Sequence, residues 1–273
     1  MTVSRVCRKS QRAVSWPLAI GALALLSACA PRVVTFPQDA GAPMADAAAV
    51  YAEVSAGCRG VRTFTAALGL SGQVGDARVR GRVIAGFARP GSMRLDGVAP
   101  FGPPAFILAA RPGAAVLLLP RDERVVRDPD ARSVLGALTG VPLSPADLLA
   151  ALTGCVVPDA AAGTGRIHDN GLATIDLGNG ATMLLRRVDG RWQPRAARRP
   201  LWDIEYDLWQ GGLPRAVRLR STGESVPVTL SVTVSEIEAN IDLPDSAFTL
   251  DVPAGTTELS LEALRQAGPL RER

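Results

Sequence analysis

The sequence predicts a mainly β protein of the α+β class, built on one large antiparallel sheet or barrel. Segments in which apolar and polar residues alternate recur along the chain, most regularly over 78–87, 202–208 and 228–235. This alternation is typical of a half-buried strand, because successive side chains point to opposite faces of a sheet. Turn sequences such as Pro-Gly, Asn-Gly and Gly-Gly separate the segments, so we expect antiparallel hairpins rather than βαβ units.

The first predicted element is a secretory signal over residues 1–28. Its basic part, 5–12, precedes an apolar stretch over 14–26, which is shorter than the roughly 20 residues that a membrane-spanning helix needs. The junction Leu-Ser-Ala-Cys ends at Cys29 and is similar to a bacterial lipobox, where the cysteine is lipidated and becomes the first mature residue. Ala30 follows and favours the outer membrane as the location. An ordinary signal, with Cys29 incidental, is the alternative.

Charge and composition exclude several functions. The chain has 30 Lys and Arg residues against 26 Asp and Glu residues, and four of the basic residues lie within 5–12. Removal of 1–28 therefore leaves equal numbers of basic and acidic residues, and a neutral domain lacks the basic surface that nucleic acid requires. Lys9 is the only lysine and His168 the only histidine. A Schiff-base lysine in the mature chain and a metal site of several histidines are thus excluded.

Cys58 and Cys155 form an even pair of cysteines in a compartment that favours oxidation. A disulfide between them would close a long loop and stabilise the fold by roughly 4 kcal/mol, because it lowers the entropy of the unfolded chain. Two buried free thiols or a redox pair are the alternatives. The C-x-x-C spacing of redox enzymes is missing from this pair, so we expect a structural disulfide.

One domain is predicted over 46–273. The segment 29–45 comprises the lipidated N-terminus and a Pro-, Gly- and Ala-rich tether. A helix over 46–57 opens the domain, with Gly57 as its stop. Besides the three regular segments, shorter strands are expected over 93–99, 105–110, 115–119, 173–177, 182–187 and 217–221.

Two short helices are predicted to interrupt the strands. The first has Asp128 as N-cap and Pro129 as its first helical residue, and it extends to Leu138. The second has Ser144 as N-cap and Asp147 three residues later, a pattern similar to a capping box. Each helix has an apolar face and ends at a glycine. Both should cover an apolar surface of the sheet, either an ordinary core or the mouth of a cavity.

Three stretches carry a resemblance to a known family: residues 97–113 (GVAPFGPPAFILAARPG), residues 138–154 with Leu-Thr-Gly at both ends, and residues 241–250 (IDLPDSAFTL). With the lipobox, they resemble the LolA/LolB superfamily, the lipoprotein carriers and outer-membrane lipoprotein receptors of the Lol sorting pathway. The resemblance implies a half barrel, in which a large curved antiparallel sheet stays unclosed and short helices form a lid over an apolar cavity. It implies no enzyme activity, no catalytic residue, no cofactor and no metal.

The resemblance also implies partners and site residues. The ligands would be acyl chains of lipoproteins or lipids, the partner a periplasmic lipoprotein carrier, and the location the periplasmic face of the outer membrane. Phe101 takes the place of an apolar residue on a loop that touches membrane lipid. The cavity would be lined by inward residues of the strands, namely Val83, Phe87, Met93, Leu95, Phe106, Leu108, Leu117, Met183 and Leu185. The lid would contact the chains through Leu135, Leu138, Leu148 and Leu152.

These assignments have plainer alternatives. Phe101 could fold back onto the sheet, and the apolar strand faces could form a filled core. The protein would then be a non-catalytic envelope structural or regulatory protein that binds a partner at the lid. A periplasmic hydrolase or a metal site would need His168 or the row Asp203, Glu205 and Asp207. We expect instead that His168 is exposed in its loop and that the acidic row is a solvated face paired with arginines.

Overall fold

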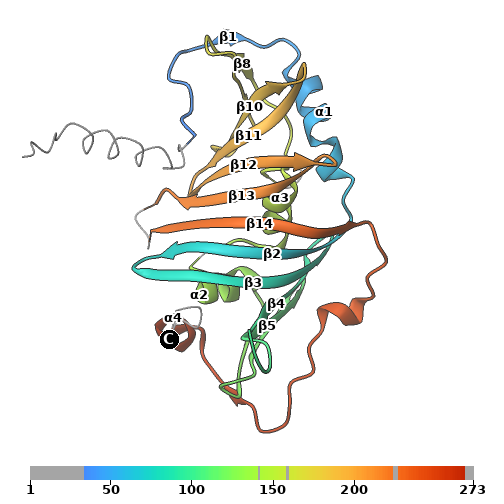
Figure 1. Ribbon diagram of the computed structural model, residues 1–273, viewed down its shortest axis with the longest axis vertical. Helices are drawn as coiled ribbons and strands as arrows, with labels where there is room; N and C mark the ends of the chain where they lie inside the picture. Colours follow the sequence, from blue (N-terminus) through green and yellow to red (C-terminus); the bar gives the residue numbers. More distant parts are fainter. Residues whose placement is uncertain (1–33, 141, 158–159, 224–226, 268–273) are drawn as a thin grey trace, which may run out of the picture. The chain divides into compact units, whose positions relative to one another are not determined.

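One open, curved sheet is the framework of the protein in a computed structural model that describes residues 34–140, 142–157, 160–223 and 227–267 (Figure 1). Within these ranges the spatial order of the strands is β1-β8-β9-β10-β11-β12-β13-β14-β2-β3-β4-β5-β6-β7-β15. Their bounds are β1 Ala42–Pro43, β2 Thr63–Val74, β3 Ala77–Ala88, β4 Ser92–Val98, β5 Phe106–Arg111, β6 Ala114–Leu119, β7 Arg124–Asp128, β8 Gly165–Ile167, β9 Ala173–Asp176, β10 Thr182–Val188, β11 Arg191–Arg199, β12 Trp202–Gln210, β13 Leu213–Ser221, β14 Val228–Ala239 and β15 Thr257–Glu258.

All the pairings are antiparallel except that of β15 with β7, and β1 and β15 are separate edges. The predicted unclosed antiparallel sheet is therefore confirmed. The three regular segments are β3, β12 and β14, and the shorter predicted strands correspond to β4, β5, β6, β9, β10 and β13.

The alternation pattern misses β2, which forms long ladders with β3 and β14 in the middle of the sheet. Its sequence, TFTAALGLSGQV, has small residues on both faces, so apolar and polar side chains alternate only weakly. The pattern also misses β11, an arginine-rich strand that contains Pro194. Proline cannot donate to a ladder and is tolerated at bulges. The register between β10 and β11 shifts between Leu184 and Leu185, and this irregularity accommodates Pro194.

Helix boundaries differ from the prediction at two places. Helix α1 (Ala47–Arg59) continues past the predicted stop at Gly57, and Gly60 is its C-cap. Helix α2 (Ala131–Thr139) begins after the predicted N-cap Asp128, because the carboxylate of Asp130 accepts a hydrogen bond from the Arg132 backbone N–H at 3.0 Å. Helix α3 (Pro145–Thr153) has the predicted capping box, with both reciprocal hydrogen bonds present.

The helices α2 and α3 cover one face of the sheet, where α3 contacts β4 and β13 and α2 contacts β6 and β7. Helix α4 (Leu261–Ala267) packs against α2 and buries Leu264. In Figure 1, α1 lies beside the sheet at one end of the strands. Within the described ranges, no helix is both long enough and apolar enough to cross a bilayer.

Candidate functional site

The residues predicted to line a cavity lie together on the covered face of the sheet. Each has at most 6% of its surface exposed, and all nine belong to one continuous apolar cluster. We call this cluster the interior. Leu135 and Leu138 of α2 and Leu152 of α3 are buried in it, and Leu148 packs against it while partly buried. The strand residues and the lid residues are thus brought into contact as one apolar layer between sheet and helices.

Two pockets formed by described residues lie away from the residues predicted to line a cavity. The larger, of about 620 Å³, lies between α1 and the segment 160–162, and the smaller, of about 300 Å³, lies beside β1 and β8. None of the nine predicted lining residues borders either pocket. The side chains of the interior are buried beneath the lid helices, so an acyl chain would reach them by displacing part of this cover.

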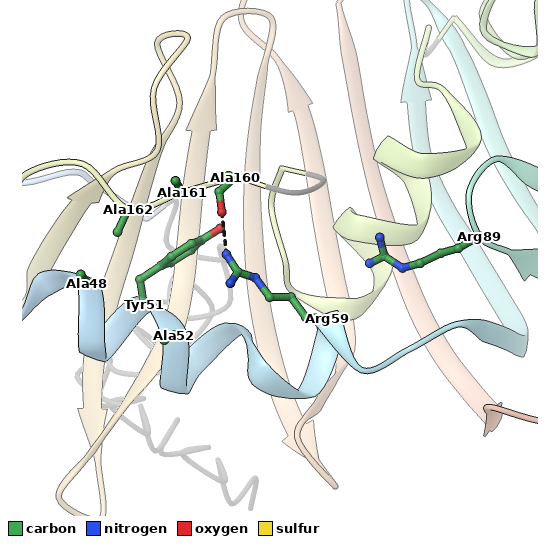
Figure 2. A pocket seen from close by; sticks show the side chains of 8 residues that line it. All are labelled: Ala48, Tyr51, Ala52, Arg59, Arg89, Ala160, Ala161 and Ala162. Carbon is green, nitrogen blue, oxygen red and sulfur yellow. Dashed lines mark hydrogen bonds between the residues drawn. The ribbon is translucent and has the colours of Figure 1, made fainter.

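The larger pocket combines an alanine-rich wall with two arginines (Figure 2). The guanidinium of Arg59 lies 4.9 Å from the centre of the Tyr51 ring and donates a hydrogen bond to the Ala160 carbonyl at 2.5 Å. Arg89 donates to the Val61 carbonyl at 2.8 Å. Both arginines therefore contribute to holding α1 and the segment after α3 in place.

Helix α3 is fastened at both ends. Near its start, the carboxylate of Asp147 accepts a hydrogen bond from Arg199 of β11 at 2.7 Å, with both side chains largely buried. Just after its end, Cys155 forms a disulfide with Cys58 of α1, so the predicted structural disulfide is present. Together these links join α3 to the sheet and to α1.

Helix α2 is held differently. An ion pair joins Arg132 of α2 to Asp147 of α3 at 3.6 Å, and the Arg132 side chain is about half exposed. Exposed ion pairs stabilise by about 0–1 kcal/mol. Its remaining described contacts to the sheet and α4 are mainly apolar, from the buried residues Ala131, Val134, Leu135, Ala137 and Leu138. Of the two helices that cover the interior, α3 is the one that a buried ion pair and a disulfide attach to other elements, whereas the ion pair of α2 is half exposed.

The position of Asp147 predicts a pH-dependent stability. Burial by itself would raise the pKa of this carboxyl, but hydrogen bonds from Ser144 and Arg199 and the charge of Arg199 outweigh it, so the pKa is lowered. A lowered pKa in the folded state contributes stability above the unfolded pKa of 3.8, and this contribution is lost as the pH falls through the folded value.

We expect Asp147→Asn to lower the free energy of unfolding at pH 7 by about 3 kcal/mol, because Arg199 loses its buried partner. The difference from the wild type should shrink below about pH 4. Urea unfolding followed by circular dichroism between pH 7 and pH 2 measures both effects. Asp122→Asn, at an exposed turn, is the matched control and should change neither. An equal difference at all pH values would contradict the role of the ionised carboxylate.

Phe101 is 88% exposed, so it does not fold back onto the sheet. It lies in the loop between β4 and β5, and its carbonyl accepts a hydrogen bond from Arg121 at 2.6 Å. The loop presents an aromatic side chain to solvent at one end of the strands. Such a side chain gains free energy if it enters lipid or contacts another protein.

The prediction of an exposed His168 is wrong, since it is 6% exposed. Its Nδ1 lies 3.0 Å from the Asp39 carboxylate and its Nε2 lies 2.9 Å from the Thr174 hydroxyl. Asp39 belongs to the segment predicted as tether, so no local pattern around His168 indicates the contact. A hydroxyl, an imidazole and a carboxylate in this order also occur in hydrolases, but neither pocket is bordered by these residues. Here the contacts attach the segment after Phe36 to the sheet.

The acidic row on β12 is paired with arginines, as predicted, but its first two members are less solvated than expected. Asp203 pairs with Arg220 at 2.6 Å and with Arg198 at 3.4 Å, and only 11% of its side chain is exposed. Glu205 is equally buried and pairs with Arg218, whereas Asp207 is exposed. Among the described residues, no group of three or more His, Cys, Asp or Glu side chains could hold a metal ion.

Two buried polar atoms beneath α3 lack a hydrogen bond, and the sequence gives no signal for them. The hydroxyl of Tyr206 finds no hydrogen-bond acceptor among the described residues, and burial raises the pKa of this phenol. The indole N–H of Trp209 also makes no hydrogen bond within the described ranges. The two rings are 5.8 Å apart. An unpaired buried polar group costs about 1–3 kcal/mol, so these donors could gain from a ligand acceptor.

No protein-family model matches the chain, and no curated protein matches it. Several solved structures are similar to it. A LolA superfamily protein from Nitrosomonas europaea has 12% identity and a TM-score of 0.48, with 75% of this chain and 98% of that chain covered. A DUF1329 family protein from Desulfovibrio piger has 11% identity, the same TM-score of 0.48 and coverages of 75% and 98%. LprF from Mycobacterium bovis has 14% identity, a TM-score of 0.32 and coverages of 75% and 98%.

Proposed function

We propose that this protein is a lipid-anchored lipoprotein on the periplasmic face of the outer membrane, which holds acyl chains between its sheet and lid helices and assists the localisation of lipoproteins. The chains would be held without covalent chemistry, by burial of apolar surface at about 25 cal/mol per Å². Acyl chains of a lipoprotein, delivered by a periplasmic carrier, are the proposed ligands. The anchor would be Cys29, which lies outside the described residues.

The interior carries this proposal. It is a continuous apolar layer whose cover consists of two nine-residue helices. Helix α2 has its own N-cap at Asp130 and a left-handed glycine at Gly140 as C-cap, so it needs few outside hydrogen bonds to stay helical. If α2 moved away as a unit, the apolar side chains of the sheet would lose their contacts with the helix. They would contact acyl chains instead. No backbone hydrogen bond of the sheet would need to break.

The unpaired donors beneath α3 support the same site. An acyl chain of a lipoprotein ends in an ester or amide carbonyl, which accepts hydrogen bonds. The Tyr206 hydroxyl and the Trp209 indole N–H are donors without acceptors next to the interior. A carbonyl placed there would satisfy one or both, which favours an acyl chain with a polar end over a pure hydrocarbon.

The burial of the interior beneath its cover also favours a second function. If α2 never leaves the sheet, the same cluster is a filled core, and the protein is a non-catalytic envelope structural or regulatory protein that binds a partner on its surface. The two functions differ in whether the native domain contains lipid.

Native mass spectrometry tests the proposal. The domain over residues 30–273, expressed in a periplasm without its anchor, should carry a stoichiometric acyl-chain adduct that lipid extraction removes. Leu148→Arg should weaken the adduct, because it places a charge where α3 meets the interior. A folded domain with only the unliganded mass, which also takes up no added lipid, would contradict acyl-chain binding and support the second function.

A further inference from the structure

Leu201 is an exposed leucine at a tight turn. It follows Pro200 in the connection from β11 to β12, and 56% of its surface is exposed. A backbone hydrogen bond joins this turn to the end of β13, because the carbonyl of Leu201 accepts from the Thr222 N–H at 3.1 Å. The side chain is thus more than half exposed at the end of the strands.

The strand register places Leu201 and Phe101 toward the same end of the strands. We call this end of the strands the edge. Trp202 pairs with Ser221, Arg220 pairs with Thr229 and Val228 pairs with Val74. The same end continues through the pair Val74–Ala77. Val98 pairs with Arg82, five residues along β3 from Ala77, and the Phe101 loop continues from Val98 in the direction of this end. Five strand spacings separate β12 from β4, which corresponds to about 24 Å along the sheet. The edge thus presents two exposed apolar side chains well apart from each other.

The N-terminal segment enters the domain at the same edge. Phe36 is 7% exposed, and the guanidinium of Arg198 lies 4.4 Å from the centre of its ring. Arg198 precedes the turn of Leu201 by three residues. Seven residues lead from Cys29 to Phe36, and an extended chain of that length spans at most about 25 Å. An anchor at Cys29 would therefore keep this edge close to the bilayer.

We propose that the edge of the sheet with Leu201 and Phe101 faces the membrane, and that Leu201 is a second point of contact with lipid. The inference rests on the proposed lipid anchor. A bilayer is the occupant that fits, because the short tether brings it to this edge and because two separate apolar side chains suit a flat surface. With both in contact, the domain would be fixed in orientation and would not swing about the tether.

Leu208 of β12, the strand that follows the turn of Leu201, provides a matched control. It is 66% exposed, slightly more than Leu201, and it lies near the other end of β12. The two leucines are seven positions apart in the sequence, which corresponds to about 23 Å along an extended strand. The edge that faces a membrane should bring lipid to Leu201 and leave Leu208 in water.

The experiment uses the full-length protein, purified from membranes and reconstituted into phosphatidylethanolamine–phosphatidylglycerol liposomes. Phe101→Cys, Leu201→Cys and Leu208→Cys are each labelled with a nitroxide, while mass spectrometry reads the acylation of Cys29 and confirms that Cys58 and Cys155 remain oxidised. Power-saturation electron paramagnetic resonance then compares broadening by oxygen, which concentrates in lipid, with broadening by a water-soluble nickel complex. We expect the oxygen-to-nickel ratio to be several-fold higher at 101 and 201 than at 208.

The possible outcomes separate this inference from the proposed function. Acylated protein with equal ratios at 201 and 208 would overturn the orientation and leave the anchor intact. A label at 201 shielded from both reagents would mean a protein neighbour at the turn and would equally overturn it. An unmodified Cys29 would overturn the proposed anchor itself, and the mass spectrum shows this before any label is measured.

Discussion

The Cys58→Ala/Cys155→Ala variant is expected to lose about 4 kcal/mol of its free energy of unfolding. The disulfide spans a sequence separation of 97 residues, so its removal restores much entropy to the unfolded chain. Both cysteines are buried, with 2% and 3% of their surfaces exposed. Alanine in both positions leaves no unpaired thiol and only a small cavity. The loss should therefore come chiefly from the missing cross-link.

Urea unfolding of the oxidised wild type and the double variant measures this difference. A reducing agent should move the transition of the wild type to that of the variant and leave the variant unchanged, which makes reduction an internal control. A loss of less than about 1 kcal/mol would contradict the chain-entropy account. It would mean that other contacts already restrain the unfolded segment between α1 and the end of α3.

The regular strands could be predicted because each exposes one face and buries the other. In β3, the arginines at 78, 80 and 82 are exposed while Val83, Ala85 and Phe87 are buried. This contrast between polar and apolar residues can be recognised in the local sequence. In β2 it is weak, because Gly69 and Gly72 lie directly against β14, where a side chain at either position would collide with Thr233 or with the backbone of Thr229. Close packing between neighbouring strands needs small residues, and small residues erase the alternation.

The members of the interior could be predicted, but its state could not. Strand faces and helix faces indicate which side chains are buried, and the nine strand residues are indeed found together with the lid residues. Whether a buried apolar face meets another side chain or a ligand depends on the distance between sheet and helices, which no local pattern contains. His168 illustrates the same limit, since its burial depends on Asp39, more than a hundred residues away in the sequence.

Leu135→Ala in α2 is expected to strengthen the binding of a fluorescent fatty acid at least about tenfold. A leucine-to-alanine change at a buried site costs about 2–5 kcal/mol of packing. In α2 that packing holds the helix against the sheet, so the change raises the population of the open form, and apparent affinity rises with that population. Leu152→Ala in α3 is the matched control, because both leucines are at most 3% exposed and in the same apolar cluster. Both variants should lose similar free energy of unfolding in urea.

Leu135 and Leu152 lie on helices that differ in their links to other elements. Helix α3 keeps Asp147–Arg199 and the disulfide after Leu152 is truncated, so its destabilisation should not open the interior and the affinity should stay near that of the wild type. Equal gains in both variants would mean that the fatty acid simply fills the space left by the leucine, and no gain in either would mean a filled core. Without the disulfide, α3 loses one of its two fastenings. Leu152→Ala should then also gain affinity in the Cys58→Ala/Cys155→Ala background, because the difference between the helices comes from these links and not from the leucines themselves.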